Sequence, residues 1–149
     1  MKKAIFDAAS ALKGSPPYPP PYDAPCKGRT MWMLTKLFGL SQFGISRVEL
    51  PPGVWSTQRH WHKTNDEAVI VISGELTVVT DDGEQVLGPG DFIAFKMNDP
   101  DAHHLQNRGT EPAVYFDIGG RDMYDVSTFP DAGFEAKYRF DLGFRPIEP

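Results

Sequence analysis

The chain has 149 residues, of which 40% are hydrophobic and 12% aromatic, enough for one packed core but not for two. Its formal net charge of −5 argues against a nucleic-acid-binding protein, which would need clustered Lys and Arg. Cys26 is the only cysteine, so an intrachain disulfide and a cysteine-based metal site are excluded. These properties indicate a small soluble protein with one domain.

The N-terminal residues are not expected to form a targeting or membrane-spanning segment. Asp7 interrupts the first apolar run too early for a signal peptide. No stretch approaches the roughly 20 apolar residues that are needed to cross a bilayer. We therefore expect a cytoplasmic protein without membrane contact.

Residues 1–42 are expected to form an N-terminal arm. Within it, residues 5–13 could be a short helix or a loosely docked terminal segment, and the sequence leaves both open. The proline-rich stretch from Ser15 to Tyr22 cannot be helix interior or a central strand, because proline lacks the N–H donor. We expect it to be extended polyproline II that lies across the domain or a partner subunit. A ligand for an SH3-type domain is the less favoured alternative.

Residues 43–119 consist of short apolar segments that are separated by strong turn signals. Asp82–Gly83, for example, is typical of a two-residue hairpin turn. The expected strands are 43–50, 54–61, 67–72, 75–80, 84–87, 91–95, 103–107 and 113–118. Their length and spacing predict an all-β fold, either an antiparallel sandwich or a small barrel.

Residues 120–149 are rich in aromatic side chains without clean periodicity. These are Tyr124, Phe129, Phe134, Tyr138, Phe140 and Phe144. Aromatic residues at this density are not expected to be free in water. We expect an irregular C-terminal tail that packs on the barrel or on a partner subunit. Together with the proline-rich stretch, it favours a homodimer.

The four histidines of the chain form two short groups, His60 with His62 and His103 with His104. On a strand, His60 and His62 point to the same side, about 6.6 Å apart along the chain. That spacing allows two imidazoles to bind one ion through bonds of roughly 2.1 Å. Glu67 follows after a four-residue turn and begins the next strand, which brings its carboxylate beside the imidazoles. His103 begins a later strand, and His104 must face the other way.

These residues resemble the first motif of the cupin family. The motif comprises Gly53, the His60-x-His62 pair, Glu67 after four further residues, and Gly74. The glycine before the histidines lies one residue further upstream than is usual in cupins.

The second cupin motif resembles the stretch from Gly90–Asp91 through His103 to Asn107. Lys96 and Asn98 stand where cupins usually have proline and glycine, and the loop before the histidines is longer. The His-x-x-x-Asn register favours His103 over His104 as a metal ligand.

The resemblance covers residues 43–119 and implies a single antiparallel cupin β-barrel, or jelly roll. It implies a metal site with the ligands His60, His62, Glu67 and His103. The chain is similar to a little-characterised branch of small single-domain cupins, some of which are labelled as sugar-phosphate isomerases.

One divalent ion is the expected cofactor, with Fe(II) or Mn(II) preferred. Three imidazoles and one carboxylate leave two positions open on an octahedral ion, Ni(II) included, for substrate or O₂. The same ligands would close the shell of tetrahedral Zn(II). Counting by twos from the ligands makes Gln58 a candidate substrate donor, and Tyr115 or Phe116 a pocket residue on the neighbouring strand.

The favoured function is a metalloenzyme that acts on a small oxygen-rich metabolite by dioxygenase- or isomerase-type chemistry. The alternative is a non-catalytic cupin that binds a sugar or an organic acid, which the absence of an obvious second acid–base residue supports. A purely structural zinc barrel is less favoured, because a barrel of this size can be stable by burial alone. No catalytic residue is assigned.

Overall fold

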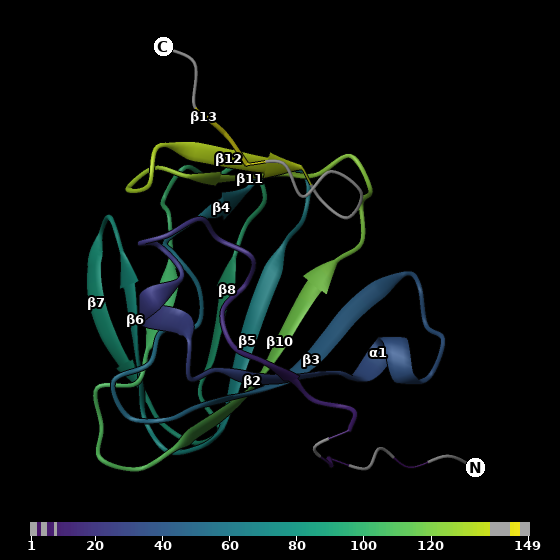
Figure 1. The fold of residues 1–149 in the computed structure, drawn as a ribbon, viewed down its shortest axis with the longest axis vertical. Helices are drawn as coiled ribbons and strands as arrows, with labels where there is room; N and C mark the ends of the chain where they lie inside the picture. The colour runs from purple at the N-terminus through teal and green to yellow at the C-terminus, as the bar shows by residue number, and fades with distance from the viewer. Residues whose placement is uncertain (1–2, 4–5, 8, 138–143, 147–149) are drawn as a thin grey trace.

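The computed structural model describes residues 3, 6–7, 9–137 and 144–146 (Figure 1). Tyr138 and Phe140 lie outside these residues, so the expectation for them is not addressed. The strands are β1 (Leu12–Lys13), β2 (Thr30–Met33), β3 (Phe43–Leu50), β4 (Trp61–His62), β5 (Glu67–Ser73), β6 (Leu76–Thr80), β7 (Gly83–Leu87), β8 (Phe92–Phe95), β9 (His104–Gln106), β10 (Ala113–Gly120), β11 (Val126–Phe129), β12 (Phe134–Lys137) and β13 (Phe144–Pro146). The helices are the 3-10 helix η1 (Ala24–Cys26) and α1 (Leu34–Leu37).

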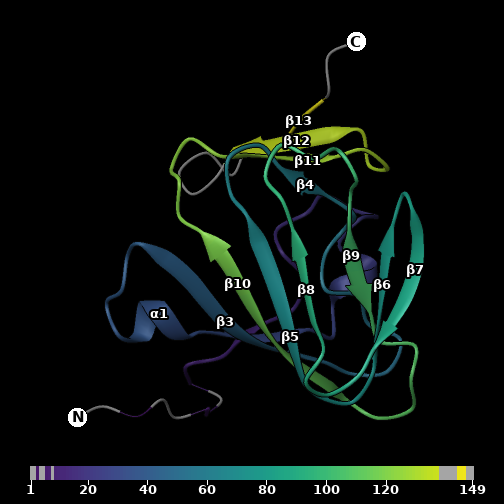
Figure 2. The same cartoon turned by 180° about the vertical axis from the view of Figure 1, so that it is seen from behind.

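The strands form three antiparallel sheets (Figures 1 and 2). The largest has the order β1-β2-β3-β10-β5-β8, and a smaller sheet has the order β7-β6-β9. The third has the order β13-β12-β11-β4 and lies across one end of the other two. The fold is all-β and mostly antiparallel, as predicted, and is consistent with a jelly roll. Within the described residues, neither helix is long enough to cross a bilayer.

The core lies between the six-stranded and the three-stranded sheets. Side chains on β3 alternate between buried and partly exposed, which is typical of a strand with one face in the core. Val48 on β3 pairs with Tyr115 on β10, which pairs in turn with Val71 on β5. These side chains pack with Leu76 and other buried residues of the smaller sheet. The same register turns Asp117, two residues beyond Tyr115, toward the interior.

Seven of the eight predicted strands correspond to β3 and to β5 through β10, but the prediction for 54–61 is wrong. Most of that segment has no strand partner and contacts the β9 region through two isolated bridges, Trp55 to Gln106 and His60 to His103. A strand resumes at Trp61–His62 because β11, from the C-terminal segment, pairs with it there. The pairing partner therefore decides where the strand lies.

Over its described residues, the N-terminal segment contains neither the short helix nor the continuous polyproline II that the sequence suggested. The described residues within 5–13 form a turn and β1 and include no helix. The proline-rich stretch ends in turns, because Tyr22 and Ala24 donate backbone hydrogen bonds to Pro19 and Pro21. The prediction of continuous polyproline II is therefore wrong over this part. Tyr18 is buried and packs edge-on against Phe129 at a centroid distance of 5.4 Å.

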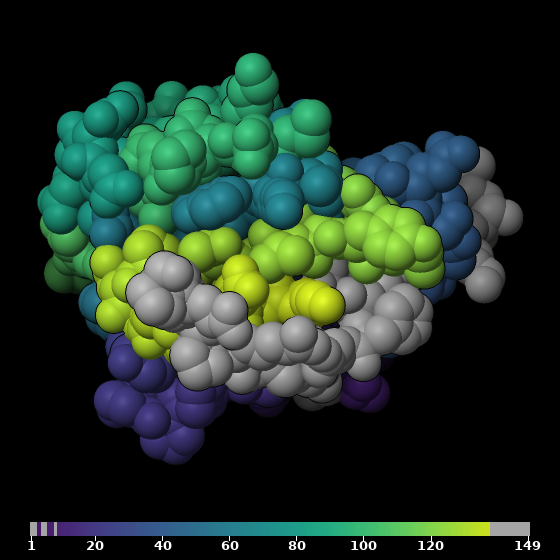
Figure 3. All heavy atoms as spheres, turned by 90° about the horizontal axis from the view of Figure 1, so that it is seen from above, coloured from purple at the N-terminus to yellow at the C-terminus, as the bar shows by residue number. Residues whose placement is uncertain are grey.

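The sequence suggested an irregular C-terminal tail, and this prediction is wrong over the described residues, which form strands. β11 and β12 form a hairpin, and β11 also pairs with β4. Figure 3 shows this segment between the teal strands of the central part of the chain and the purple N-terminal residues. Phe129 and Phe134 are buried in a second cluster with Tyr18 and Cys26. The alternation of aromatic and polar residues was too short to predict these strands.

Candidate metal centre

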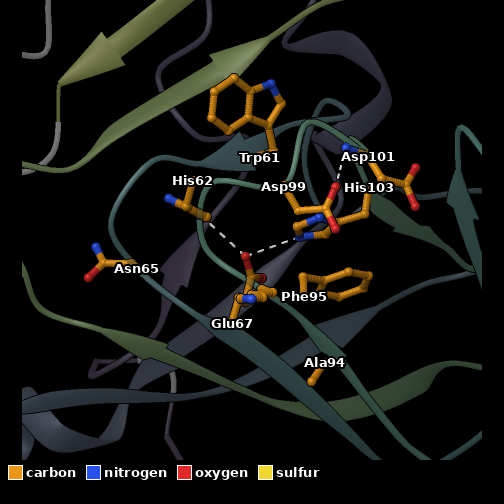
Figure 4. A pocket seen from close by; sticks show the side chains of 10 residues that line it. Trp61, His62, Asn65, Glu67, Ala94, Phe95, Asp99, Asp101 and His103 are labelled. Atoms are coloured by element: carbon orange, nitrogen blue, oxygen red, sulfur yellow. Dashed lines mark hydrogen bonds and ion pairs between the residues drawn. The ribbon is translucent and has the colours of Figure 1, made fainter.

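Three imidazoles converge on one carboxylate oxygen. The Nε2 atoms of His103, His62 and His60 lie 3.2, 3.3 and 3.6 Å from Oε2 of Glu67. Ligand atoms of His60, His62 and Glu67 all lie within 4.8 Å of one another. Figure 4 shows His62 and His103 reaching the carboxylate from different sides. The structure thus brings together the four predicted ligand residues.

Backbone pairing explains this convergence. His60 and His103 exchange both backbone hydrogen bonds, at 3.0 and 2.9 Å, so their rings lie side by side. His62 is two residues beyond His60 and points to the same side, with ring centroids 4.9 Å apart. Glu67 begins β5, and its side chain faces the rings from the larger sheet.

The hydrogen bonds behind the rings determine which nitrogen faces the centre. Nδ1 of His60 lies 3.0 Å from the Gln58 carbonyl, and Nδ1 of His62 lies 2.6 Å from a carboxylate oxygen of Asp125. Both partners only accept hydrogen bonds, so each Nδ1 carries a proton and donates it. Neutral rings of this tautomer direct their Nε2 lone pairs at the Glu67 carboxylate. Such a group of acceptors requires a cation between them.

The distances fit a metal ion as that cation. Two ligand atoms about 2.1 Å from one ion lie roughly 3.0 Å apart at right angles and roughly 3.4 Å apart in a tetrahedron. The three distances to Glu67, 3.2 to 3.6 Å, are close to this range. His60, His62 and Glu67 could therefore hold a divalent ion, and the His103 ring, which lies outside this group of three, would have to approach the ion to become a fourth ligand.

Burial and ion pairing have opposite effects on the pKa values of the groups at the centre. Burial raises the pKa of Glu67, but the charged form of the carboxyl is favoured by its contacts with the imidazoles of His103, His60 and His62, which hold the pKa well below its usual range. Burial lowers the pKa of His60. Burial also acts to lower that of His62, but hydrogen bonds to Asp125 and Glu67 outweigh it and raise the pKa to about 10. Without metal, a proton on His62 therefore supplies the positive charge.

His103 and His104 occupy different environments. The ring of His103 stacks on Phe95 at a centroid distance of 3.4 Å, with its Nε2 toward Glu67. His104 turns away, its Nδ1 3.1 Å from the Thr57 carbonyl, and its ring packs edge-on against Trp55. Burial lowers the pKa of His104 to about 4, so it is neutral. Of the two, His103 is the residue at the cluster.

Two sizeable cavities border histidines of the cluster as well as Glu67, and a third, of about 510 Å³, borders Glu67 but none of the three histidines. One, of about 170 Å³, is lined by Trp61, Lys96 and Asp99 together with His62, Glu67 and His103 (Figure 4). The other, of about 220 Å³, is lined by Ser46, Asp117 and Arg121 together with His60, His62 and Glu67. A small molecule in either of the first two cavities could therefore contact the candidate metal position.

The two predicted pocket residues line neither of these cavities. The side-chain amide of Gln58 donates to the Tyr22 carbonyl at 2.6 Å, so it is committed to the N-terminal segment. Tyr115 faces inward and is 3% exposed. It lines a cavity of about 20 Å³ beneath the cluster, which is too small for a metabolite. Substrate contact by Gln58 or Tyr115 stays a prediction that these positions do not favour.

Sequence reasoning missed Asp117 and Asp125. Burial, followed by the nearby Glu67 carboxylate, raises the pKa of Asp117 to about 8. Side chains alternate along a strand, so counting two residues on from Tyr115 would have predicted that the Asp117 carboxyl also faces inward. Asp125 is fully buried behind His62. It precedes a strand that the sequence did not predict, and no local signal marks it.

These features define an antiparallel β-fold with a His–His–Glu cluster that could bind a metal. Residues 46–119 match the family model described as a cupin domain. Together with the related structures below, this match shows that the chain belongs to the cupin superfamily, as the motifs indicated. A search of curated proteins found no match.

Two solved structures are similar in sequence as well as in fold. The first is a sugar phosphate isomerase from a cupin superfamily, from Silicibacter pomeroyi, with 34% identity, a TM-score of 0.87, and coverage of 96% of this chain and 92% of that one. The second is a putative sugar phosphate isomerase from Acidithiobacillus ferrooxidans, with 32% identity, a TM-score of 0.73, and coverage of 80% and 76%. A polyketide cyclase from Streptomyces resistomycificus, at 18% identity and a TM-score of 0.63, covers 82% of this chain and 81% of its own and shares the fold alone.

Proposed function

We propose that this protein is a metal-dependent isomerase that acts on a small sugar phosphate or a closely related oxygen-rich metabolite. The observation that carries the proposal is the convergence of three imidazoles on Glu67 beside a cavity that also contains the Asp117 carboxyl. The two relatives that are more than 30% identical, a sugar phosphate isomerase and a putative one, support this substrate class. Fe(II) or Mn(II) is the proposed ion, because an octahedral shell leaves two positions for substrate oxygens.

When bound, the ion would act as a Lewis acid on adjacent carbonyl and hydroxyl oxygens of the substrate. Aldose–ketose isomerisation then moves one proton between neighbouring carbons and a second proton from the hydroxyl oxygen of one carbon to the carbonyl oxygen of the other, so all atoms are conserved. A group beside the substrate must accept this proton and return it. Asp117 is the candidate, because it faces the interior from β10 and lines the cavity of about 220 Å³. A single carboxyl can serve both carbons if it lies on one side of them.

Arg121 is the proposed contact for the anionic end of the substrate. It lines the same cavity as Asp117, and its guanidinium lies over Gly44. A Cβ at Gly44 would be 2.5 Å from the nearest guanidinium nitrogen, so glycine provides the room that Arg121 needs. Guanidinium groups suit phosphate because their fork matches two oxygens at once. A substrate bound at both ends would span the cavity from Arg121 to the ion.

The test is isomerisation in D₂O by Mn²⁺-loaded protein, with a panel of aldose and ketose phosphates followed by ¹H NMR. The wild-type protein should exchange the proton next to the carbonyl and interconvert the two sugars. Asp117→Asn should keep its Mn²⁺ but exchange at least 100-fold more slowly. Arg121→Gln should raise KM for phosphorylated substrates more than for their unphosphorylated counterparts. Asp82→Asn, in an exposed hairpin turn, is the matched control and should behave as wild type.

Other outcomes would favour other functions. Oxygen consumption on the same panel would replace the isomerase by a dioxygenase. Thermal stabilisation by a sugar or an organic acid without turnover would indicate the non-catalytic binding protein.

A further inference from the structure

Behind His62 lies a carboxylate that belongs to the C-terminal segment. Asp125 lies beyond residues 46–119, the part of the chain that matches the cupin domain. Its Oδ2 is 2.6 Å from Nδ1 of His62, on the ring edge opposite the nitrogen that faces Glu67. Asp125 is 0% exposed. A buried carboxylate at this distance holds the ring in one orientation.

The second carboxylate oxygen of Asp125 also accepts hydrogen bonds. Oδ1 accepts a hydrogen bond from the backbone N–H of Thr64 at 2.8 Å and another from its hydroxyl at 3.2 Å. Both partners belong to the loop between the His62 strand and Glu67. Asp125 therefore cannot rotate without leaving the part-buried N–H of Thr64 without its acceptor.

Strand pairing holds Asp125 against the metal-ligand strand. Ser127 on β11 is the register partner of His62 on β4, and its Oγ lies 3.2 Å from the same Nδ1. The backbone N–H of Lys63 donates to the Val126 carbonyl at 3.0 Å. The segment is also fixed before Asp125, where the backbone of Asp122 donates to the Asn65 side chain at 3.0 Å.

The three imidazoles differ in what lies behind them. Nδ1 of His60 donates to the neutral Gln58 carbonyl. Nδ1 of His103 has no hydrogen-bond partner within the described parts of the chain. His62 alone of the three is backed by a carboxylate among these residues. A carboxylate behind a metal-binding imidazole fixes its tautomer and increases the basicity of the other nitrogen.

We infer that Asp125 is a positioning residue of the metal centre, so that the C-terminal segment completes a site whose ligands all lie in the cupin domain. The inference rests on the proposed metal site. It gives residues 120–129 a role in function: they hold the His62 nitrogen toward the ion from the far side of the ring. Loss of such a partner generally weakens metal binding by 10- to 100-fold.

Asp125→Asn is the sharpest test, because the change is isosteric. The Thr64 N–H must keep an acceptor, so the amide oxygen of the new side chain should take that position and its NH₂ group should face His62. Nδ1 must then accept instead of donate, and the proton moves to Nε2, where it blocks the metal. Titration with Mn²⁺ or Zn²⁺ alone should show a Kd at least 10-fold weaker than that of the wild-type protein.

A second readout reports on the ring itself. Long-range ¹H–¹⁵N spectra of the metal-free proteins should show a protonated His62 Nδ1 in the wild type and an unprotonated one in Asp125→Asn. A purely structural role would not move this signal. Asp122→Asn is the matched control, since it changes a carboxylate of the same segment that contacts the Tyr124 backbone. It should keep both the wild-type affinity and the His62 spectrum.

Should Asp125→Asn fail to fold, Thr64→Val loosens Asp125 while keeping the backbone donor, and should weaken metal binding several-fold. Equal affinity and an unchanged His62 Nδ1 in Asp125→Asn would overturn this inference alone. A wild-type protein without affinity for any divalent ion would overturn the metal site, and the inference with it.

Discussion

Glu67 concentrates the negative charge at the centre of the cluster. It is partly buried, with three imidazole nitrogens within 3.6 Å of one of its oxygens. A carboxylate in this position is stabilised only while a cation or imidazolium protons face it. Substitution of a side chain at this centre should therefore change the metal content strongly, whereas substitution of a neighbouring residue should change it little.

Glu67→Gln should abolish tight metal binding at little cost in volume, because an amide oxygen is a much weaker ligand than a carboxylate. We expect at least a 100-fold increase in the Kd for Mn²⁺, measured by calorimetry, and loss of metal from the purified protein. Glu75→Gln, on an exposed residue, should leave both unchanged. Metal retention by Glu67→Gln would contradict the proposed ligand set.

The adjacent histidines provide a direct comparison. His103→Ala should lose metal, because its Nε2 faces Glu67. His104→Ala should keep metal but lose about 1–3 kcal/mol of unfolding free energy, since it leaves the Thr57 carbonyl and a packed ring face without a partner. Metal analysis with urea unfolding separates the two effects. The reverse result would make His104 the ligand.

At the scale of elements, the turn from β5 to β6 must pass close to the beginning of β10. Gly74 has φ of +74°, and a Cβ there would lie 2.7 Å from the Pro112 carbonyl oxygen and 2.8 Å from Ala113 Cα. Both neighbours are backbone, which cannot move aside cheaply. This glycine therefore allows the larger and smaller sheets to join at the end of β5 opposite Glu67.

Gly74→Ala should destabilise the fold by about 2 kcal/mol or more, because it combines a strained φ with a backbone collision. Gly88→Ala is the control, since its φ is not positive and the nearest atom to its Cβ would be 3.9 Å away. Chemical unfolding of both variants gives the comparison. Equal unfolding midpoints for Gly74→Ala and Gly88→Ala would show that the turn adjusts to the added methyl group, contrary to this prediction.

At the scale of the whole molecule, the metal centre joins segments from distant parts of the chain. Its ligands come from the β4 strand, the start of β5 and the segment before β9, with β11 behind them. An ion bound here cross-links these segments in the folded state and has no equivalent site in the unfolded chain. Metal should therefore stabilise the entire fold.

Removal of metal with EDTA should lower the melting temperature. At an ion concentration of 100 times Kd, binding contributes about 2.7 kcal/mol, which corresponds to roughly 5–10 °C for a chain of this size. Scanning fluorimetry before and after re-addition of Mn²⁺ measures the shift. The melting temperature of Glu67→Gln should be the same before EDTA, after EDTA and after re-addition of Mn²⁺.

The homodimer remains a prediction at this scale. Phe92 and Val86 are 62% and 61% exposed, large values for apolar side chains. Light scattering coupled to size-exclusion chromatography should give a mass near twice that of the 16.6 kDa chain. A monomeric mass across micromolar concentrations would contradict it.

The sequence determined the all-β class, seven strands and the four residues that converge at the site. It could do so because turn residues, strand alternation and ligand spacing are local properties of the chain. The His60-x-His62 pair places two imidazoles on one face of a strand wherever that strand lies.

Tertiary structure alone decided what depends on distant partners. The strand at Trp61–His62 exists because β11 pairs with it, more than 60 residues later, and Asp125 meets His62 for the same reason. Gln58 points to the N-terminal segment and not to the cavity, because the Tyr22 carbonyl lies within its reach. A hydrogen bond or a burial between remote segments has no local signature, since it arises only when the fold brings those segments together.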